Sequence, residues 1–294
     1  HFLLMNIIND IHQSYKKGDL LSKLIYLNLF VFLFYKVLAT LFFLFSIQNT
    51  SIISWLALSS DFNSLLTKPW TIISHMFYHQ GFIHLTFNLI GLYFYGKIFS
   101  QYLNSKQLVS TYVIGGLFGA LFYYLSFNYL EAFDSSNKSF AFGASAAVLA
   151  ILTAISTYTP NYRVTIPLVA KFELKYIAIA FIIIDIILIP SSNGGGHIAH
   201  LGGAFYGFYF GHRLKQGKDI SIWFNNLMDS IVNYFRKDPN LKTVHKRAKT
   251  DDAWRNEKKQ SQDQINIILE KISKSGYESL NDKEKEILFK ESKK

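Results

Sequence analysis

Six long apolar stretches, separated by more polar segments, set the pattern of this chain. They cover residues 24–47, 83–99, 108–130, 140–158, 176–189 and 197–214. A helix needs about 20 apolar residues to cross a hydrocarbon layer of about 30 Å, and most of these stretches approach that length. The pattern therefore predicts an all-α, polytopic membrane domain of six helices over residues 24–214, preceded by a cytoplasmic N-terminal segment, residues 1–23.

The segment between the first two stretches, residues 48–82, is too long for a simple turn and too polar for a span. It carries Trp55 and Trp70 among leucines and polar residues. Tryptophan is enriched where lipid meets water. We expect this segment to lie in the membrane interface rather than to cross the bilayer.

After Lys215 the pattern becomes that of a cytoplasmic helical tail. Between residues 220 and 235 apolar side chains recur at helical spacing, which predicts an amphipathic helix on the membrane surface. Residues 237–261 are then expected to form a charged linker. We group these elements as one region, residues 215–261.

Residues 262–294 form the last predicted unit, a small helical hairpin. Gly276 is expected to end its first helix. Asn281 and Glu284 have the spacing of a capping box at the start of the second helix. No chemistry is visible in this tail, and the sequence does not name its partner.

Composition agrees with a membrane protein. Half of the 294 residues are hydrophobic and only 17% are charged, which is low for a soluble protein of this length. The formal net charge is +10, but the lysines and arginines cluster in loops and in the last third. This placement indicates a lipid bilayer rather than nucleic acid as the acidic partner. The chain has no cysteine, so disulfides and thiolate metal sites are excluded.

The loops differ in basic residues, and this difference predicts the topology. Loops 97–106 and 163–175 carry lysines or arginine, whereas 48–82, 131–138 and 191–196 are poor in both. By the positive-inside rule the first group is cytoplasmic, so both termini are cytoplasmic as well. We expect a multi-pass protein of a bacterial plasma membrane.

The chain starts at His1, and Met5 is a candidate for its natural initiator. Charged residues precede the first apolar stretch, which argues against a cleaved signal peptide.

Ser145 is the first candidate for chemistry, at the start of the fourth stretch. Its neighbours are small, as in Gly143-Ala-Ser-Ala-Ala, and small residues are typical of closely packed membrane helices. Taken alone, Ser145 would indicate packing. The predicted topology, however, places three more polar side chains at the same outer depth: His200 in the sixth stretch, and His84 and Asn88 one turn apart in the second. Buried polar groups at one level within a membrane mark a functional site.

A glycine pattern in the sixth stretch would bring these groups together. Gly203, Gly207 and Gly211 come after His200, are spaced four residues apart and lie on one face of the predicted helix. Such a face permits close approach to the helix that carries Ser145. A serine hydroxyl becomes a good nucleophile when an adjacent base takes its proton, and histidine suits that task near neutral pH.

At these residues the chain resembles the rhomboid family of intramembrane serine proteases. The resemblance covers about residues 24–214 and rests on three motifs, namely Gly143-Ala-Ser145, His200-x-x-Gly203-x-x-x-Gly207 and His84-x-x-x-Asn88. It implies a six-helix bundle, a Ser145–His200 dyad without an acidic third member, His84 and Asn88 in stabilisation of the oxyanion, and cleavage of transmembrane protein substrates near the outer face. It implies no cofactor and no metal. Trp70, His75 and His79 also fall where the family's first outer loop has comparable residues.

The chain departs from the family pattern at two positions. Ala146 follows the serine where many members have glycine, and Thr71 follows Trp70 where many have arginine.

Other interpretations remain open at this point. A rhomboid-like protein without activity that binds membrane clients would have the same fold. A transporter or channel would also bury polar residues. A zinc protease is disfavoured, because Met76 stands between His75 and His79 where the zinc motif needs glutamate. For Asp185, late in the fifth stretch, we favour pairing with another polar group over orientation of a histidine, and we place His197 at the mouth of the site.

Overall fold

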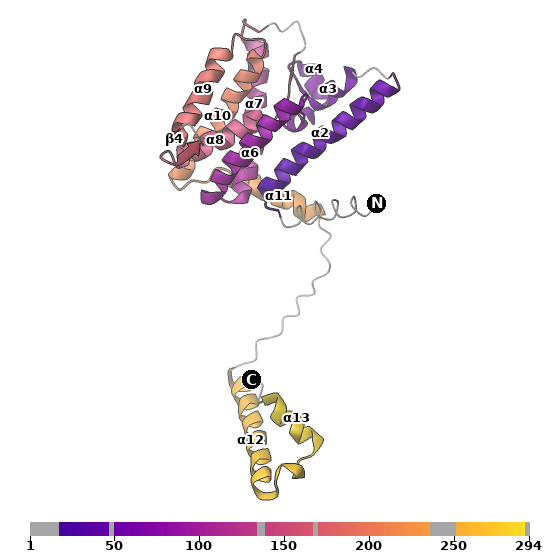
Figure 1. The fold of residues 1–294 in the computed structure, drawn as a ribbon, viewed down its shortest axis with the longest axis vertical. Coiled ribbons are helices and arrows are strands. Elements are labelled where there is room, and N and C mark those ends of the chain that lie inside the picture. The colour runs from indigo at the N-terminus through magenta and orange to yellow at the C-terminus, as the bar shows by residue number, and fades with distance from the viewer. Residues whose placement is uncertain (1–17, 47–49, 134–138, 167–169, 236–250, 292–294) are drawn as a thin grey trace. The chain divides into compact units, whose positions relative to one another are not determined.

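The structure is a computed structural model that describes residues 18–46, 50–133, 139–166, 170–235 and 251–291. Most of the predicted N-terminal segment, residues 1–23, lies outside these ranges. The chain divides into two compact units, residues 1–236 and 237–294. The larger unit is almost entirely helical (Figure 1).

Each of the six apolar stretches forms one helix. These helices are α2 (Leu20–Leu44), α6 (Phe82–Tyr102), α7 (Ser105–Tyr129), α8 (Ser145–Tyr158), α9 (Leu174–Leu188) and α10 (Gly194–Lys215). Of the helices in the described ranges, α2 and α7 are long and apolar enough by themselves to cross a membrane, and α8 is a shorter apolar helix. In Figure 1, α9 and α2 lie at opposite edges of this bundle.

Helix α8 is the inner helix of the bundle. Every residue from Ala146 to Ser156 is buried, and the helix packs against α10, α7, α6 and α9. By contrast, α9 buries only Leu174, Ala178 and Asp185. The candidate serine therefore begins the most enclosed helix, and Asp185 belongs to a helix whose other side chains are largely exposed.

Small residues allow the inner helices to approach closely. A methyl group added at Gly203, Gly207 or Gly211 of α10 would collide with the backbone carbonyl oxygens of Ala146, Ala150 and Ala154 of α8, respectively. A methyl group on Gly119 of α7 would likewise come within 2.6 Å of the Ala146 side chain and within 3.0 Å of the Ala199 carbonyl oxygen of α10. The expected glycine face of the sixth helix is thus confirmed, and it faces the serine helix.

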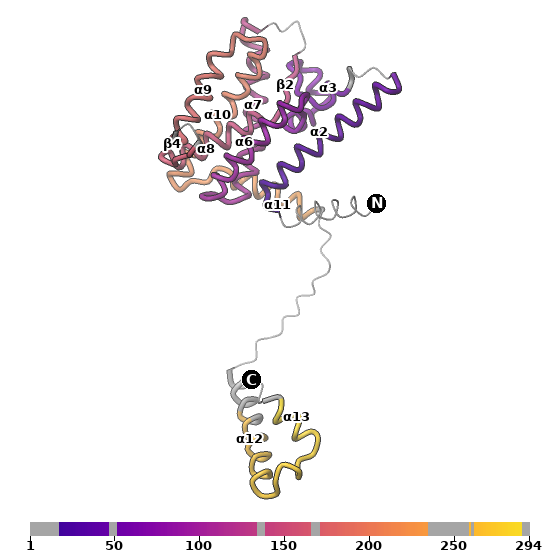
Figure 2. Tube along the Cα trace, in the orientation of Figure 1, coloured from indigo at the N-terminus to yellow at the C-terminus, as the bar shows by residue number. Residues whose placement is uncertain are grey.

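The fourth helix begins later than predicted. Phe140 and Ala141 form a short strand, β2 (Phe140–Ala141), which is labelled in Figure 2. It pairs antiparallel with β1 (Leu58–Ser59). Gly143 then adopts φ +112°, in the left-handed region, and α8 starts at Ser145. The expected start at residue 140 is wrong, because pairing with a distant strand holds the preceding residues in an extended conformation.

The segment between α2 and α6 is built of short elements. They are α3 (Thr50–Leu56), β1, α4 (Phe62–Thr67) and α5 (Thr71–Ser74). The rings of Trp55 and Trp70 stack at 5.2 Å, and the Trp70 indole N–H donates to the Trp55 carbonyl at 2.9 Å. The end of the segment is more buried than an interfacial position predicts, because Met76 is fully enclosed beside Gly116 of α7.

Three further elements belong to the described part of the larger unit. The strands β3 (Arg163–Ile166) and β4 (Ala170–Glu173) form an antiparallel hairpin between α8 and α9. The predicted amphipathic helix is α11 (Ile222–Phe235). Its Asp229 pairs with Lys106 at 2.6 Å near the start of α7.

The smaller unit contains α12 (Asp251–Ser275), the short 3₁₀ helix η1 (Tyr277–Ser279) and α13 (Asp282–Glu291). Helix α12 starts at Asp251, before the expected boundary at residue 261. The last part of the predicted linker is therefore helical. The capping box is confirmed: the Asn281 N–H donates to the Glu284 carboxylate at 2.8 Å, and the Glu284 N–H donates to the Asn281 side chain at 2.9 Å.

Candidate active site

Ser145 is the first residue of α8, and the backbone before it is held in place by two histidines. The Gly143 N–H donates to the His75 carbonyl at 2.8 Å. The Ala144 N–H donates to His79 Nε2 at 3.2 Å. The first N–H groups of a helix have no acceptor within the helix, so the start of α8 offers backbone donors beside the Ser145 hydroxyl.

His200 of α10 lies opposite Ser145. Its Nε2 and the Ser145 Oγ are 2.7 Å apart, within the range of a strong hydrogen bond. The glycine face of α10 explains this approach, because Gly203 brings the α10 backbone against Ala146, the residue after the serine. The two residues that the sequence singled out first therefore meet.

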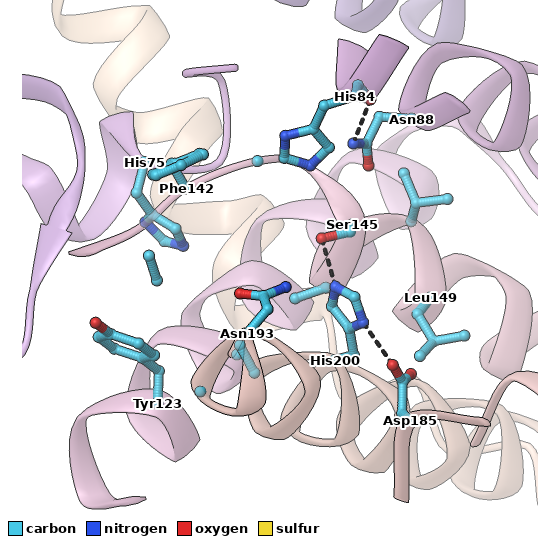
Figure 3. A pocket seen from close by; sticks show the side chains of 18 of the residues that line it. His75, His84, Asn88, Tyr123, Phe142, Ser145, Leu149, Asp185, Asn193 and His200 are labelled. Carbon is cyan, nitrogen blue, oxygen red and sulfur yellow. Dashed lines mark hydrogen bonds and ion pairs between the residues drawn. The ribbon is translucent and has the colours of Figure 1, made fainter. Parts of the chain in front are cut away.

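Asp185 of α9 lies on the other side of the His200 ring. Its Oδ1 is 2.8 Å from His200 Nδ1 and 2.8 Å from His197 Nδ1. Figure 3 shows Ser145, His200 and Asp185 in one line. Asp185 therefore pairs with two polar side chains, as we favoured, and one of them is the candidate base. His197 likewise contacts Asp185 and does not belong to the residues that line the cavity described below.

A cavity of about 740 Å³ contains the site. Ser145, His200, His84, Asn88 and Asp185 all line it, as Figure 3 shows. The His84 ring lies against Gly143, since a methyl group on Gly143 would come within 2.6 Å of His84 Cε1. The Asn88 side-chain amide donates one hydrogen bond to the His84 carbonyl at 2.9 Å. The structure thus brings all four predicted site residues to one cavity.

His75 and His79 take backbone-fixing roles. Besides the contacts above, His75 Nδ1 donates to the Thr71 carbonyl at 3.1 Å, and His79 Nδ1 donates to the Phe77 carbonyl at 3.2 Å. Both side chains are buried.

Within the described ranges, the one group of three side chains placed to hold a metal ion is Asp185, His197 and His200, whose ligand atoms lie within 4.8 Å of one another. Hydrogen bonds at 2.8 Å account for this proximity.

Sequence reasoning missed the contact of Asp185 with His200. A signal was present in the spacing of Leu174, Ala178 and Asp185, which share one helical face. These three are the buried residues of α9, so Asp185 faces the bundle. The sequence does not reveal which neighbour that face meets.

The arrangement has the elements of nucleophilic catalysis. A hydroxyl within 2.7 Å of a histidine nitrogen can transfer its proton to that nitrogen. The helix N-terminus, together with the amide and imidazole groups in the cavity, supplies hydrogen-bond donors for a developing negative charge. The fold and the site together are those of a helical protein in which a serine hydroxyl at the start of a buried helix contacts a histidine ring nitrogen.

Comparison with known proteins identifies the family. The Rhomboid domain matches residues 66–216, just over half of the chain, and a family of unknown function (DUF6576) matches residues 248–294. The chain belongs to the rhomboid family, which is membrane-embedded and includes serine proteases.

Curated relatives are distant. RHOMBOID-like protein 5 of Arabidopsis thaliana is 30% identical over 151 residues, which cover 49% of this chain and 43% of that protein. Presenilin-associated rhomboid-like protein A, mitochondrial, of Danio rerio is 26% identical over 166 residues, with 53% and 42% covered. Rhomboid protease GluP of Bacillus subtilis is 25% identical over 187 residues, with 60% and 34% covered. The chain spans less than half the length of each of these relatives.

Proposed function

We propose that this protein is an intramembrane serine endopeptidase that uses a Ser145–His200 dyad. The observation that carries the proposal is the hydrogen bond of 2.7 Å between Ser145 Oγ and His200 Nε2 at the start of a buried helix. His200 takes the hydroxyl proton while Ser145 attacks the scissile carbonyl. His200 then returns the proton to the leaving amine, and water releases the acyl group by the same steps.

Three groups are proposed to stabilise the oxyanion. The backbone N–H of Ser145 is one of the free donors at the helix start. An asparagine amide carries two N–H donors, and one of those on Asn88 is used within its own helix, which leaves the other for substrate. His84 offers a ring N–H from the same wall of the cavity. These hydrogen-bond donors are in position before the reaction begins. They stabilise the negative charge that develops on the substrate oxygen in the transition state.

The walls of the cavity favour an apolar polypeptide as the substrate. Phe87 and Ile90 of α6, and Phe181 and Ile184 of α9, line the cavity while 43–71% of their surface is exposed. This apolar surface suits a transmembrane segment that enters from the side. An intact helix hides its carbonyl groups in hydrogen bonds, so substrates with helix-weakening glycine or proline near the cleavage site are expected.

We further propose six membrane spans with both termini on the cytoplasmic side. The support is the six-helix arrangement, with basic residues concentrated in alternate loops. The bacterial plasma membrane stays a prediction, because one of the relatives named above, from Danio rerio, is a mitochondrial protein.

Cleavage of a single-span test protein tests the function. We expect the purified wild type in liposomes to cut a substrate whose span is interrupted by glycines. Ser145→Ala and His200→Ala should reduce cleavage below detection, because loss of either member of such a pair costs about 10⁶-fold in a comparable hydrolase. Thermal unfolding in detergent should show that both variants remain folded.

Two results would contradict the proposal. Cleavage by Ser145→Ala would show that Ser145 is not the nucleophile. A folded wild type that binds the test substrate but leaves it intact would favour a client-binding protein without activity.

A further inference from the structure

Asp185 is a buried carboxylate on a helix that otherwise faces outward. Its side chain is 7% exposed, whereas its neighbours Ile184 and Ile186 are 50% and 52% exposed. An ionisable group placed among apolar side chains is costly unless it is paired, and in a membrane protein it marks a functional position. The partners of Asp185 therefore indicate its role.

Both partners of Asp185 are histidines of α10. His200 and His197 each direct Nδ1 at the same carboxylate oxygen, at 2.8 Å. An ionised carboxylate has no hydrogen to donate and can only accept hydrogen bonds. Each histidine Nδ1 that contacts it must therefore carry the hydrogen. His197 and His200 are three residues apart and share one face of the helix. One carboxylate thus fixes two rings.

The bond to His200 determines which of its nitrogens is the base. A neutral imidazole carries one N–H, and placing it on Nδ1 leaves the lone pair on Nε2. Nε2 is the atom that lies 2.7 Å from Ser145 Oγ. When Nε2 takes the serine proton, the ring becomes positive, and the adjacent carboxylate stabilises that charge.

We propose that Asp185 is a positioning residue that holds His200 in the tautomer and orientation needed to deprotonate Ser145. His197 holds the carboxylate from its other side. The inference rests on the proposed protease function and extends the dyad with a third, acidic member. Asp185 acts through His200 alone, with no bond formed to the substrate.

The competing explanation is that Asp185 merely ties α9 to α10. A carboxylate with a structural role of that kind is present elsewhere in the chain. Asp219 accepts hydrogen bonds from Gln107 Nε2 at 2.7 Å and from the Ser221 N–H at 2.8 Å, remote in sequence from the site residues. Asp219→Asn is therefore a matched control for Asp185→Asn.

The test measures kcat, KM and melting temperature on the same preparations. We expect Asp185→Asn to lower kcat by about 10²- to 10⁴-fold with KM little changed, since the asparagine amide favours the wrong tautomer of the base. Asp185→Glu should recover part of kcat, because it restores the carboxylate. His197→Ala should cost less than Asp185→Asn. Asp219→Asn should lower the melting temperature and keep the wild-type kcat per folded molecule.

Several outcomes would overturn the proposal. Wild-type kcat in Asp185→Asn would do so, and so would an equal loss in Asp219→Asn, because that loss would reflect weakened folding. If Asp185→Asn does not fold, Asp185→Ala decides, because it also removes the carboxylate: a lower kcat per folded molecule supports the role, and a wild-type kcat per folded molecule refutes it. An inert wild type would overturn the proposed function together with this role, whereas an active wild type with an unaffected Asp185→Asn would overturn this role alone.

Discussion

Gly143 shows how tightly the residues next to Ser145 are constrained. Its φ of +112° lies in the left-handed region, which side chains other than glycine rarely adopt. A methyl group there would also come within 2.6 Å of the His84 ring. The same residue therefore turns the chain into α8 and allows His84 to lie beside the start of that helix. The motif Gly143-Ala-Ser145 is explained by this geometry.

Asn88→Ala should slow catalysis strongly without abolishing it. One donor aimed at a developing oxyanion is worth about 2.7–4 kcal/mol, or about 100- to 1,000-fold in kcat. The other proposed donors, His84 and the Ser145 N–H, would remain. KM should change little, because the charge exists only in the transition state. Cleavage rates over a range of substrate concentrations check this.

The control for Asn88→Ala is a measurement of its melting temperature beside that of the wild type. Asn88 also bonds to the His84 carbonyl within α6, so the substitution can weaken the helix. Full activity per folded molecule, with a lower melting temperature, would show that Asn88 only supports the helix.

At the scale of residues, the Ser145–His200 pair is easier to predict from the sequence than the contacts around it. Ser145, His200, His84 and Asn88 were accessible because each belongs to a short motif with fixed spacing. The contact of Asp185 with His200 could not be predicted in this way, because it depends on the rotation of α9 and on the distance between α9 and α10. Both quantities are set by packing over the whole bundle, and no local pattern records them.

Helices α8 and α10 form the rigid pair on which the site depends. Glycines 203, 207 and 211 of α10 lie against the carbonyl groups of alanines 146, 150 and 154 of α8. Association of membrane helices relies on such close contact of small residues, because lipid offers no hydrophobic driving force between them. The distance between Ser145 and His200 is therefore a consequence of backbone packing about one to three turns away.

Gly207→Ala should destabilise the protein and reduce its activity. The new methyl group would collide with the Ala150 carbonyl and the Thr153 hydroxyl. Overpacking of this kind costs about 1–3 kcal/mol, which exceeds the gain of about 0.5–1 kcal/mol from replacing glycine by alanine within a helix. Displacement of α10 would also lengthen the Ser145–His200 bond. Melting temperature in detergent and cleavage rate measure the two effects.

Gly81→Ala is the matched control for this substitution. Gly81 has φ −120° at the start of α6, and nothing lies within 4 Å of an added methyl group. Its melting temperature and activity should stay close to wild type. A Gly207→Ala protein as stable and active as Gly81→Ala would refute the packing argument.

At the scale of elements, hydrophobic periodicity predicts the helices and misses the strands. All six apolar stretches became helices, whereas β2 was taken for the start of the fourth helix. Its partner, β1, lies about 80 residues earlier in the chain. Two apolar residues such as Phe140 and Ala141 carry no local pattern that separates a strand from a helix. The start of α12 was missed for another reason, since charged sequence was interpreted as a linker.

For the molecule as a whole, the enclosed position of α8 links fold to function. The helix that carries Ser145 is covered on all sides, while its first residue opens into the cavity. Under the proposed function, this arrangement keeps the Ser145 hydroxyl from lipid and leaves it open to a substrate in the cavity. All of the proposed site residues belong to the unit of residues 1–236.

The second unit is residues 237–294. It overlaps the match to a family of unknown function. Within it, Ile268 and Leu280 are buried and Lys271 pairs with Glu284 at 2.9 Å. Division of the chain at residues 23, 214 and 261 stays a prediction.

The most direct test of the central claim is covalent labelling of Ser145. A fluorophosphonate probe reacts with a serine only when an adjacent base activates it. We expect the purified full-length wild type to be labelled in detergent, with the adduct mapped to Ser145 by mass spectrometry and with no labelling of folded Ser145→Ala. A folded wild type that stays unlabelled, or an adduct on another residue that persists in Ser145→Ala, would contradict the account.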